Sequence, residues 1–177
     1  MTKNIFDNKD PRIALATYTI EYFTKTGVVP SLPLDTPKEL LEVKKACFVT
    51  LKIEGSLRGC VGTILPDKEN LALEIVSNAI SACSRDPRFH PVRIDELEDL
   101  EFSVDVLSKP EKIKSKKDLD VNKYGVIVST TFKKGLLLPM LEGINDVDTQ
   151  VEIALRKAGI GSKEKYSLER FEVVRYQ

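Results

Sequence analysis

The sequence lacks the features that mark membrane and exported proteins. It has no apolar run close to the ~20 residues that a helix needs to span a bilayer. Its start, from Met1 to Asp7, lacks the charged-then-apolar order of a signal peptide. We therefore expect a cytoplasmic protein that does not associate with a membrane.

Cysteine and histidine are scarce. The three cysteines, Cys47, Cys60 and Cys83, form an odd set without a CxxC spacing, and His90 is the one histidine of the sequence. An odd and scattered set argues against a disulfide framework and against a structural zinc site. The sequence therefore predicts a protein of a reducing compartment, with no metal site.

Net charge is absent as well, because 27 basic residues balance 27 acidic ones. This balance argues against a dedicated nucleic-acid binder, although it leaves room for a local basic patch. The motifs GxxxxGK(S/T), GxGxxG, HExxH and GxSxG do not occur. The sequence thus indicates no nucleotide, zinc-protease or esterase chemistry, and it assigns no cofactor.

What the chain does contain is an alternation of helical and hairpin patterns. Three helices with capping residues at their starts are predicted, at 11–27, 70–86 and 146–159. Strand patterns are joined in pairs within 46–63 and 124–138, and they stand alone at 101–108 and 171–175. The proline-containing segment 28–37 and the charged segment 109–120 are predicted as connectors.

This order of elements predicts an α+β fold, with a mainly antiparallel sheet and flanking helices, because no regular βαβ alternation is present. No linker divides the chain, so we predict one domain over residues 1–177. This domain could consist of a larger and a smaller lobe. A hairpin followed by a helix occurs twice, at 46–85 and 124–158. An old duplication is one explanation, but the two segments share no residue pattern that supports it.

The run LRGCVGT, residues 57–63, is the most informative stretch. Glycines inside a strand indicate that something approaches the backbone closely or that the strand is bulged. Bare backbone, a thiol and a guanidinium together favour recognition of a small anionic or carbonyl-bearing ligand. Four residues of the run are therefore candidates for ligand binding: Arg58, Gly59, Gly62 and Thr63.

Cys60 has two interpretations. As a nucleophile it would have a thiolate favoured by Arg58, whereas as structure it would be a small buried side chain, which free cysteine most often is. A two-residue turn at 54–55 would place Cys60 opposite Val49 and Arg58 opposite Leu51. A turn with one more residue would reverse this parity and leave Arg58 at the surface.

The loop DPRFHPV supplies the second group of candidates. Asp86 and Arg88, two positions apart, can pair with each other or project from the loop. As a site, Asp86 would be a carboxylate partner for Arg58 or an acid–base group, and Arg88 would be an anion clamp. The alternative is that Asp86 only accepts backbone N–H groups in a turn. We expect His90 in an exposed loop, and a dyad of Cys60 and His90 is left open.

Six motifs follow one another along the chain: LRGCVGT at 57–63, DPRFHPV at 86–92, SVDVLS at 103–108, GVIV at 125–128, GLLLP at 135–139 and RKAGI at 156–160. Together they resemble the AMMECR-one domain family, whose prokaryotic members are also called AmmeMemoRadiSam system protein A. The resemblance implies an α+β fold with two lobes, a cleft near the LRGC motif and cytoplasmic residence. It also implies association with MEMO-like and radical SAM proteins in many prokaryotes, and the family's activity is not established.

Two hypotheses of function follow. In the first the chain is an enzyme or enzyme subunit, in which Cys60 is a nucleophile or redox thiol and Asp86 an orienting group or base. Arg58 and Arg88 would then hold an anionic group of the substrate. In the second the chain is a non-catalytic module that binds a small ligand or a partner protein. The first is slightly favoured, because a cysteine between glycines is an unusual choice for packing alone.

Overall fold

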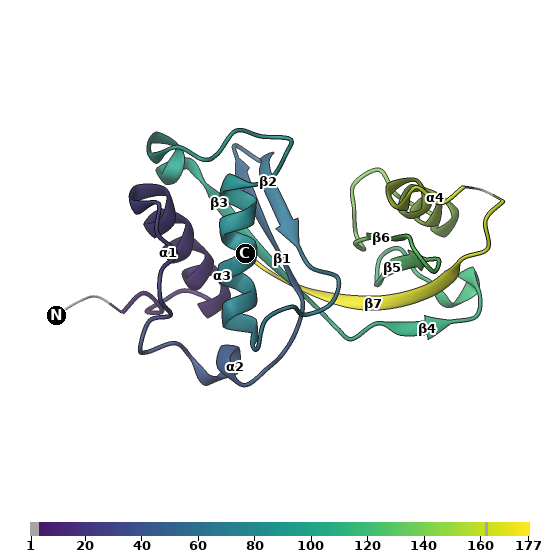
Figure 1. Cartoon of the computed structure of the whole chain (residues 1–177), viewed down its shortest axis with the longest axis horizontal. Coiled ribbons are helices and arrows are strands. Elements are labelled where there is room, and N and C mark those ends of the chain that lie inside the picture. The colour runs from purple at the N-terminus through teal and green to yellow at the C-terminus, as the bar shows by residue number, and fades with distance from the viewer. Residues whose placement is uncertain (1–3, 162) are drawn as a thin grey trace. The chain divides into compact units, whose positions relative to one another are not determined.

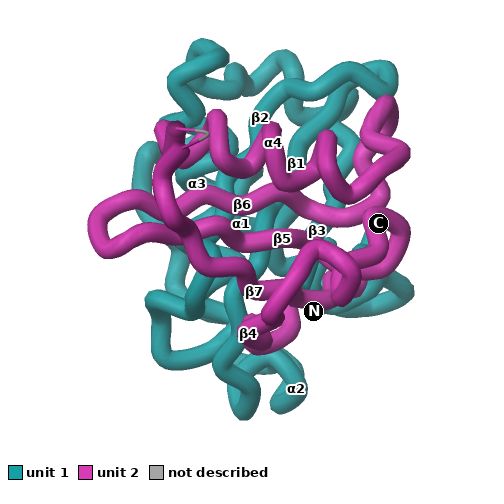
Figure 2. The backbone as a smooth tube through the Cα atoms, turned by 90° about the vertical axis from the view of Figure 1, so that its right-hand side faces the viewer, with its two compact units in different colours: residues 1–106, 175–177 teal, residues 107–174 magenta. Residues whose placement is uncertain are grey.

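The computed structural model describes residues 4–161 and 163–177, and the chain divides into two compact units (Figures 1 and 2). Unit 1 comprises residues 1–106 and 175–177, and unit 2 comprises residues 107–174. The expectation that no signal peptide is present rests partly on residues 1–3, which lie outside the described residues.

Unit 1 is built on a three-stranded antiparallel sheet. Its strands, in the spatial order β2-β1-β3, are β1 (Cys47–Ile53), β2 (Ser56–Gly62) and β3 (Glu101–Leu107). Its helices are α1 (Pro11–Thr26), α2 (Lys38–Leu41), α3 (Leu71–Ser84) and a 3₁₀ helix (Ile94–Asp99). Helices α1 and α3 cover one face of the sheet (Figure 1), and the core of the unit lies between them and β1.

Unit 2 has its own antiparallel sheet, in the order β4-β7-β5-β6, and its own core. Its strands are β4 (Glu111–Ile113), β5 (Tyr124–Ser129), β6 (Lys134–Leu137) and β7 (Ser167–Tyr176). Helix α4 (Val147–Ala158) packs its buried side chains against β5 and β6. The last residues of β7 belong to unit 1, where Arg175 forms two hydrogen bonds with Asp105 of β3, of 2.7 and 2.9 Å.

The ends of the long helices follow from their capping residues. The side chain of Asp10 accepts a hydrogen bond at the start of α1, Asn70 does so for α3 and Asp146 for α4. Gly27 and Gly159 end α1 and α4 in the left-handed conformation, with φ of 72° and 67°. The predicted helices, the two hairpins and the α+β class with a mainly antiparallel sheet are confirmed.

The predicted connectors were wrong in part. Segment 109–120 contains the three-residue strand β4, which pairs with β7, and a 3₁₀ helix over Lys116–Asp118. Both are too short to show a period in the sequence. Helix α2 is a single turn, too short for a periodic pattern. The last strand also extends beyond the predicted 171–175. Among the described residues, no helix has both the length and the apolar character that crossing a bilayer requires.

Candidate functional site

A β-bulge in the first hairpin decides where its candidate residues point. The turn between β1 and β2 has two residues, as the sequence predicts. Beyond it the register slips: Lys52 pairs with Leu57, whereas Leu51 pairs with Gly59. Arg58 is therefore the extra residue of the bulge, which is one of the two explanations that glycines in a strand suggest.

The bulge moves Cys60 to the other face of the sheet. Gly59 faces α3, because a Cβ atom there would lie 2.3 Å from the carbonyl oxygen of Ala82. Successive residues of a strand alternate between faces, so Cys60 points away from α3 and pairs with Thr50. The predicted pairing of Cys60 with Val49 is thus wrong, as is that of Arg58, because turn length alone does not reveal a bulge.

The two glycines of the motif are required by the packing of the chain itself. A side chain at Gly59 would collide with the backbone of α3, and one at Gly62 would lie 2.3 Å from the ring of Phe48. The expected close approach to the backbone is therefore present, but α3 and Phe48 make it. The geometry gives neither glycine a role in ligand binding.

Asp86 is a buried carboxylate with four hydrogen bonds. Its side chain is 3% exposed; it accepts from the backbone N–H of Cys60 at 2.9 Å and from that of Arg88 at 3.1 Å. It also accepts from Nε and Nη2 of Arg88, at 2.9 and 2.7 Å. These bonds, chiefly those from the Arg88 side chain, hold the pKa of Asp86 well below its ordinary value. A carboxylate so fully occupied is a poor general base. Of the two partners that the sequence left open, Arg88 is the one it takes, and not Arg58.

Arg58 pairs instead with Glu96 of the 3₁₀ helix. Its Nε and Nη2 donate to the two carboxylate oxygens at 2.7 and 2.9 Å. Its Nη1 and Nη2 also donate to the carbonyl oxygens of His90 and Pro91, at 3.0 and 3.4 Å. Arg58 thus fastens the loop 86–92 to β2, and its charge is matched within the protein.

Thr63 is held by a second buried carboxylate, Glu74 of α3. Its hydroxyl donates to Glu74 Oε1 at 2.5 Å, and Oε2 accepts from the backbone N–H groups of Asp67 and Lys68 at 2.9 and 2.8 Å. Glu74 is 1% exposed. The geometry therefore gives Thr63 a structural role, because it anchors the loop between β2 and α3.

The thiol of Cys60 is half-buried and protonated at neutral pH. Burial raises its pKa, and the hydroxyl of Thr50 donates a hydrogen bond to Sγ at 3.2 Å. Burial likewise raises the pKa of Cys47 to about 12 and of Cys83 to about 11. Within the part of the chain that the structure describes, no hydrogen bond joins His90 to Cys60, and no three His, Cys, Asp or Glu side chains cluster as for a metal ion.

Arg88 is the candidate whose charged group remains accessible. Its side chain is 54% exposed although Asp86 fixes two of its nitrogens, and Nη2 also reaches the carbonyl oxygen of Cys60 at 3.3 Å. The ring of Phe89 lies 5.5 Å from the guanidinium carbon. Together with Pro87 and the exposed His90, these residues line a hollow of about 450 Å³.

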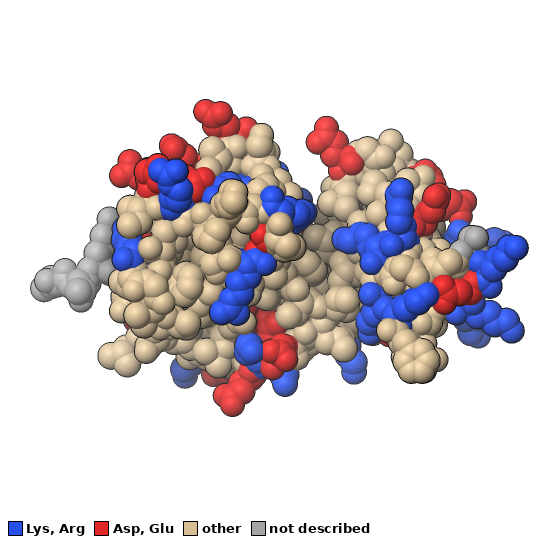
Figure 3. Space-filling view, turned by 45° about the horizontal axis from the view of Figure 1, so that its top comes forward, with Lys and Arg blue, Asp and Glu red and all other residues tan. Residues whose placement is uncertain are grey.

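Charge is unevenly spread over the face of the molecule shown in Figure 3. Lysine and arginine side chains gather on unit 2, with acidic side chains among them, whereas both signs alternate on unit 1. The candidate residues, by contrast, lie on unit 1.

Similar proteins span bacteria and archaea. The family model AMMECR1 matches residues 13–177. Protein CA_C1420 of Clostridium acetobutylicum is 49% identical over 170 residues, which are 96% of this chain and 36% of that protein. A protein of Thermotoga maritima is 47% identical over 169 residues, 94% of this chain and 97% of that protein. The crystal structure of uncharacterized protein PH0010 from Pyrococcus horikoshii has a TM-score of 0.83 and 32% identity, and the match covers 93% of this chain and 88% of that one.

Proposed function

The chain belongs to the AMMECR1 family, and we propose that it binds a small anionic ligand at the exposed guanidinium of Arg88. The observation that carries this proposal is the fixed orientation of that group. Asp86 holds Nε and Nη2 from the buried side, yet the side chain is 54% exposed. A guanidinium held in this way leaves the two N–H donors of Nη1 for a carboxylate or phosphate oxygen without further ordering, because Nε and Nη2 are taken by Asp86 and by the carbonyl oxygen of Cys60.

The surroundings of Arg88 support a small ligand. The hollow of about 450 Å³ falls within the roughly 300–1,000 Å³ that is common for small-molecule sites. Phe89 offers an apolar surface beside the guanidinium, so the ligand we envisage carries an anionic group on an apolar or aromatic body. The adjacent loop is fixed at both ends, by Arg58 with Glu96 and by Asp86 with the backbone of Cys60.

The state of Cys60 favours binding over nucleophilic catalysis. A nucleophilic cysteine needs a lowered pKa or an adjacent base, and burial shifts the pKa of Cys60 the other way. Asp86 lies next to it but accepts four hydrogen bonds already. In our proposal Cys60 lies beside the site as a neutral thiol, and its backbone contacts Asp86 and Arg88. Association with MEMO-like and radical SAM proteins stays a prediction, tested by co-purification.

Benzoate is a suitable probe of the Arg88 site, since it combines a carboxylate with a ring that fits Phe89. We expect saturable binding, measured by two-dimensional NMR titration, with shifts centred on residues 86–90. Arg88→Gln should weaken it about tenfold, which corresponds to ~1.4 kcal/mol and to the loss of one charge-assisted pair. Arg93→Gln is the matched control, because the side chain of Arg93 is exposed and pairs with Asp95, outside the hollow. Equal affinity in Arg88→Gln and wild type, or no saturation at all, contradicts the proposal.

Labelling with iodoacetamide tests the state of Cys60. Because its pKa is raised, the native protein should label at Cys60 more slowly at pH 7 than the protein unfolded in guanidinium chloride, with the rate rising only above the ordinary thiol pKa of ~8.5. Site-resolved mass spectrometry separates Cys60 from Cys47, which is fully buried and should stay unlabelled in the native state. Faster labelling of Cys60 in the native state at pH 6 to 7 would restore the nucleophile hypothesis.

A further inference from the structure

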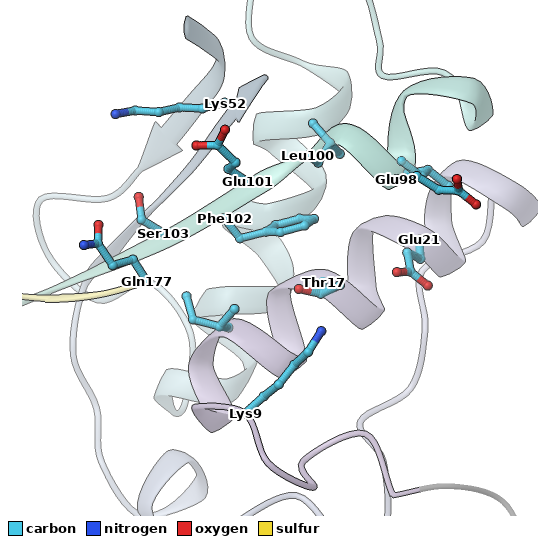
Figure 4. A pocket seen from close by; sticks show the side chains of 12 residues that line it. Lys9, Thr17, Glu21, Lys52, Glu98, Leu100, Glu101, Phe102, Ser103 and Gln177 are labelled. Carbon is cyan, nitrogen blue, oxygen red and sulfur yellow. The ribbon is translucent and has the colours of Figure 1, made fainter. Parts of the chain in front are cut away.

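A second hollow, of about 690 Å³, lies at the other side of unit 1 (Figure 4). It is formed between α1 and the first residues of β3, whereas Cys60 lies on β2. In the strand order β2-β1-β3 the two places are at opposite edges of the three-stranded sheet. The hollow is therefore separate from the Arg88 site, and nothing in the proposed function uses it.

The floor of this hollow is apolar. Ile13 of α1, Leu97 of the 3₁₀ helix and Phe102 of β3 all line it and pack against the core of the unit. Figure 4 shows the ring of Phe102 directed from β3 toward α1. A ligand here would cover hydrophobic surface that the fold leaves open, and the volume again suits a small molecule.

An unpartnered hydroxyl lies in the same wall. Thr17 Oγ1 is buried, and among residues 4–161 and 163–177 it has no hydrogen-bond partner. Thr17 differs in this from two other threonines of α1. The hydroxyls of Thr19 and Thr26 each donate a hydrogen bond of 2.7 Å to the carbonyl oxygen four residues earlier. Buried polar groups are normally paired, and because this oxygen is closed to solvent, a ligand would reach it only after rotation of the Thr17 side chain.

Charged side chains of both signs stand around the apolar floor, and they form no ion pairs with one another among the described residues. Lys9 stands at the start of α1, and in Figure 4 its side chain reaches along the helix toward Thr17. Glu21 and Glu98 lie toward the other end of the hollow. Within the described part of the chain Lys9 and Glu98 form no ion pair, and the partner of Glu21 is Lys25, one turn further along α1 and 3.8 Å away. Among the described residues, Lys9 and Glu98 are thus available to a ligand, and Glu21 has only a long and exposed pair that a ligand can replace.

We propose that this hollow binds a zwitterion with an apolar side chain, the chemistry of a free amino acid. The ammonium group of the ligand would lie between Glu21 and Glu98. Its carboxylate would be held by Lys9, and its side chain would cover Phe102. Charge-assisted hydrogen bonds at both ends would give the site its selectivity, because a ligand with only one charge leaves one end without a partner.

Three probes that share a phenylethyl body test this assignment: L-phenylalanine carries both charges, phenethylamine only the ammonium and 3-phenylpropionate only the carboxylate. Titrations followed by two-dimensional NMR should show saturable binding of L-phenylalanine with shifts around α1 and β3. Each singly charged probe should bind about tenfold more weakly. Equal affinity of the three probes overturns the zwitterion assignment, and so does the absence of saturation by L-phenylalanine.

Variants connect each charge of the probe to one residue. Lys9→Gln should weaken L-phenylalanine about tenfold while leaving phenethylamine unchanged, and Glu21→Gln should weaken phenethylamine while leaving 3-phenylpropionate unchanged. Lys45→Gln, at an exposed lysine outside the hollow, is the control for loss of a surface charge. Arg88→Gln should not alter L-phenylalanine binding, so this site and the Arg88 site can fail separately. A Lys9→Gln variant that binds all three probes as wild type does contradicts the proposal.

Discussion

Replacing Asp86 by alanine should lower the free energy of unfolding by about 3 kcal/mol, the lower end of the range for breaking a buried ion pair. The carboxylate is buried and accepts four hydrogen bonds, two from backbone N–H groups and two from Arg88. Its removal leaves the N–H of Cys60 without its partner. We expect the lower end of the range because Arg88 is half-exposed and can be rehydrated. Urea unfolding of variant and wild type at pH 7 measures the difference.

The same carboxylate gives the stability a defined dependence on pH. Its pKa is lower in the folded than in the unfolded chain, so its contribution is fully present above the unfolded value of ~3.9 and is lost as the pH falls below that value. The stability gap between wild type and Asp86→Asn should therefore be constant from pH 7 to pH 5 and narrow below pH ~4. Asp95→Asn is the control, because its partner Arg93 and Asp95 itself are both exposed. A gap that does not change with pH, or an Asp86→Ala variant as stable as Asp95→Asn, contradicts this account.

The parts of the fold that depend on short-range sequence were predictable. The starts of the three long helices were predictable from their capping residues, Asp10, Asn70 and Asp146. A side-chain acceptor placed before an apolar pattern satisfies free N–H groups of the first helical turn. The turn at Glu54 and Gly55 was predictable for a similar reason, since both residues have positive φ and glycine tolerates it. These are local requirements, and the residues that meet them stand within four positions of one another.

The candidate site depends on contacts between distant residues, which the sequence does not display. Arg58 and Glu96 are separated by 38 positions, and Glu96 stands in an acidic run where nothing distinguishes it from its neighbours. The sequence therefore left two partners open for Asp86, and the structure pairs it with Arg88, two positions away, and not with Arg58. The bulge at Arg58 is not visible in the apolar pattern of the sequence either, and the adjacent Gly59 is its one sign. Glycine was a correct sign of close packing, but sequence cannot say that the approaching group is α3 and not a ligand.

The ion pairs Arg58–Glu96 and Asp86–Arg88 have different roles. Arg58 and Glu96 fasten the loop 86–92 to β2, and their charges cancel in a largely buried pair. Asp86 ties the same loop to the backbone of Cys60 and orients Arg88 outward. One arginine therefore holds the loop in position, and the other is free to meet a ligand at little cost in ordering, which is the physical basis of the function proposed above.

The glycine beside the bulge should be the most sensitive position of the hairpin. In Gly59→Ala the new methyl group would lie 2.3 Å from the carbonyl oxygen of Ala82, far inside van der Waals contact. The obstacle is the backbone of α3, so no rotation of a neighbouring side chain can relieve it, and β2 must move away from the helix. We expect a loss of about 3 kcal/mol in the free energy of unfolding, the upper part of the usual range for overpacking. Urea unfolding of the purified variant measures it.

Two further measurements separate this collision from a general effect of replacing glycine. Gly161→Ala is the matched control, because its added Cβ would meet only the flexible side chain of Glu164, at 3.4 Å, and it should change stability by less than about 0.5 kcal/mol. Movement of β2 away from α3 should also open the packing around α3, so the buried thiol of Cys83 on this helix should label faster with iodoacetamide in Gly59→Ala than in wild type, under conditions where both are folded. If Gly59→Ala unfolds at the same urea concentration as Gly161→Ala, the close packing of β2 against α3 is not what fixes glycine in the LRGC motif.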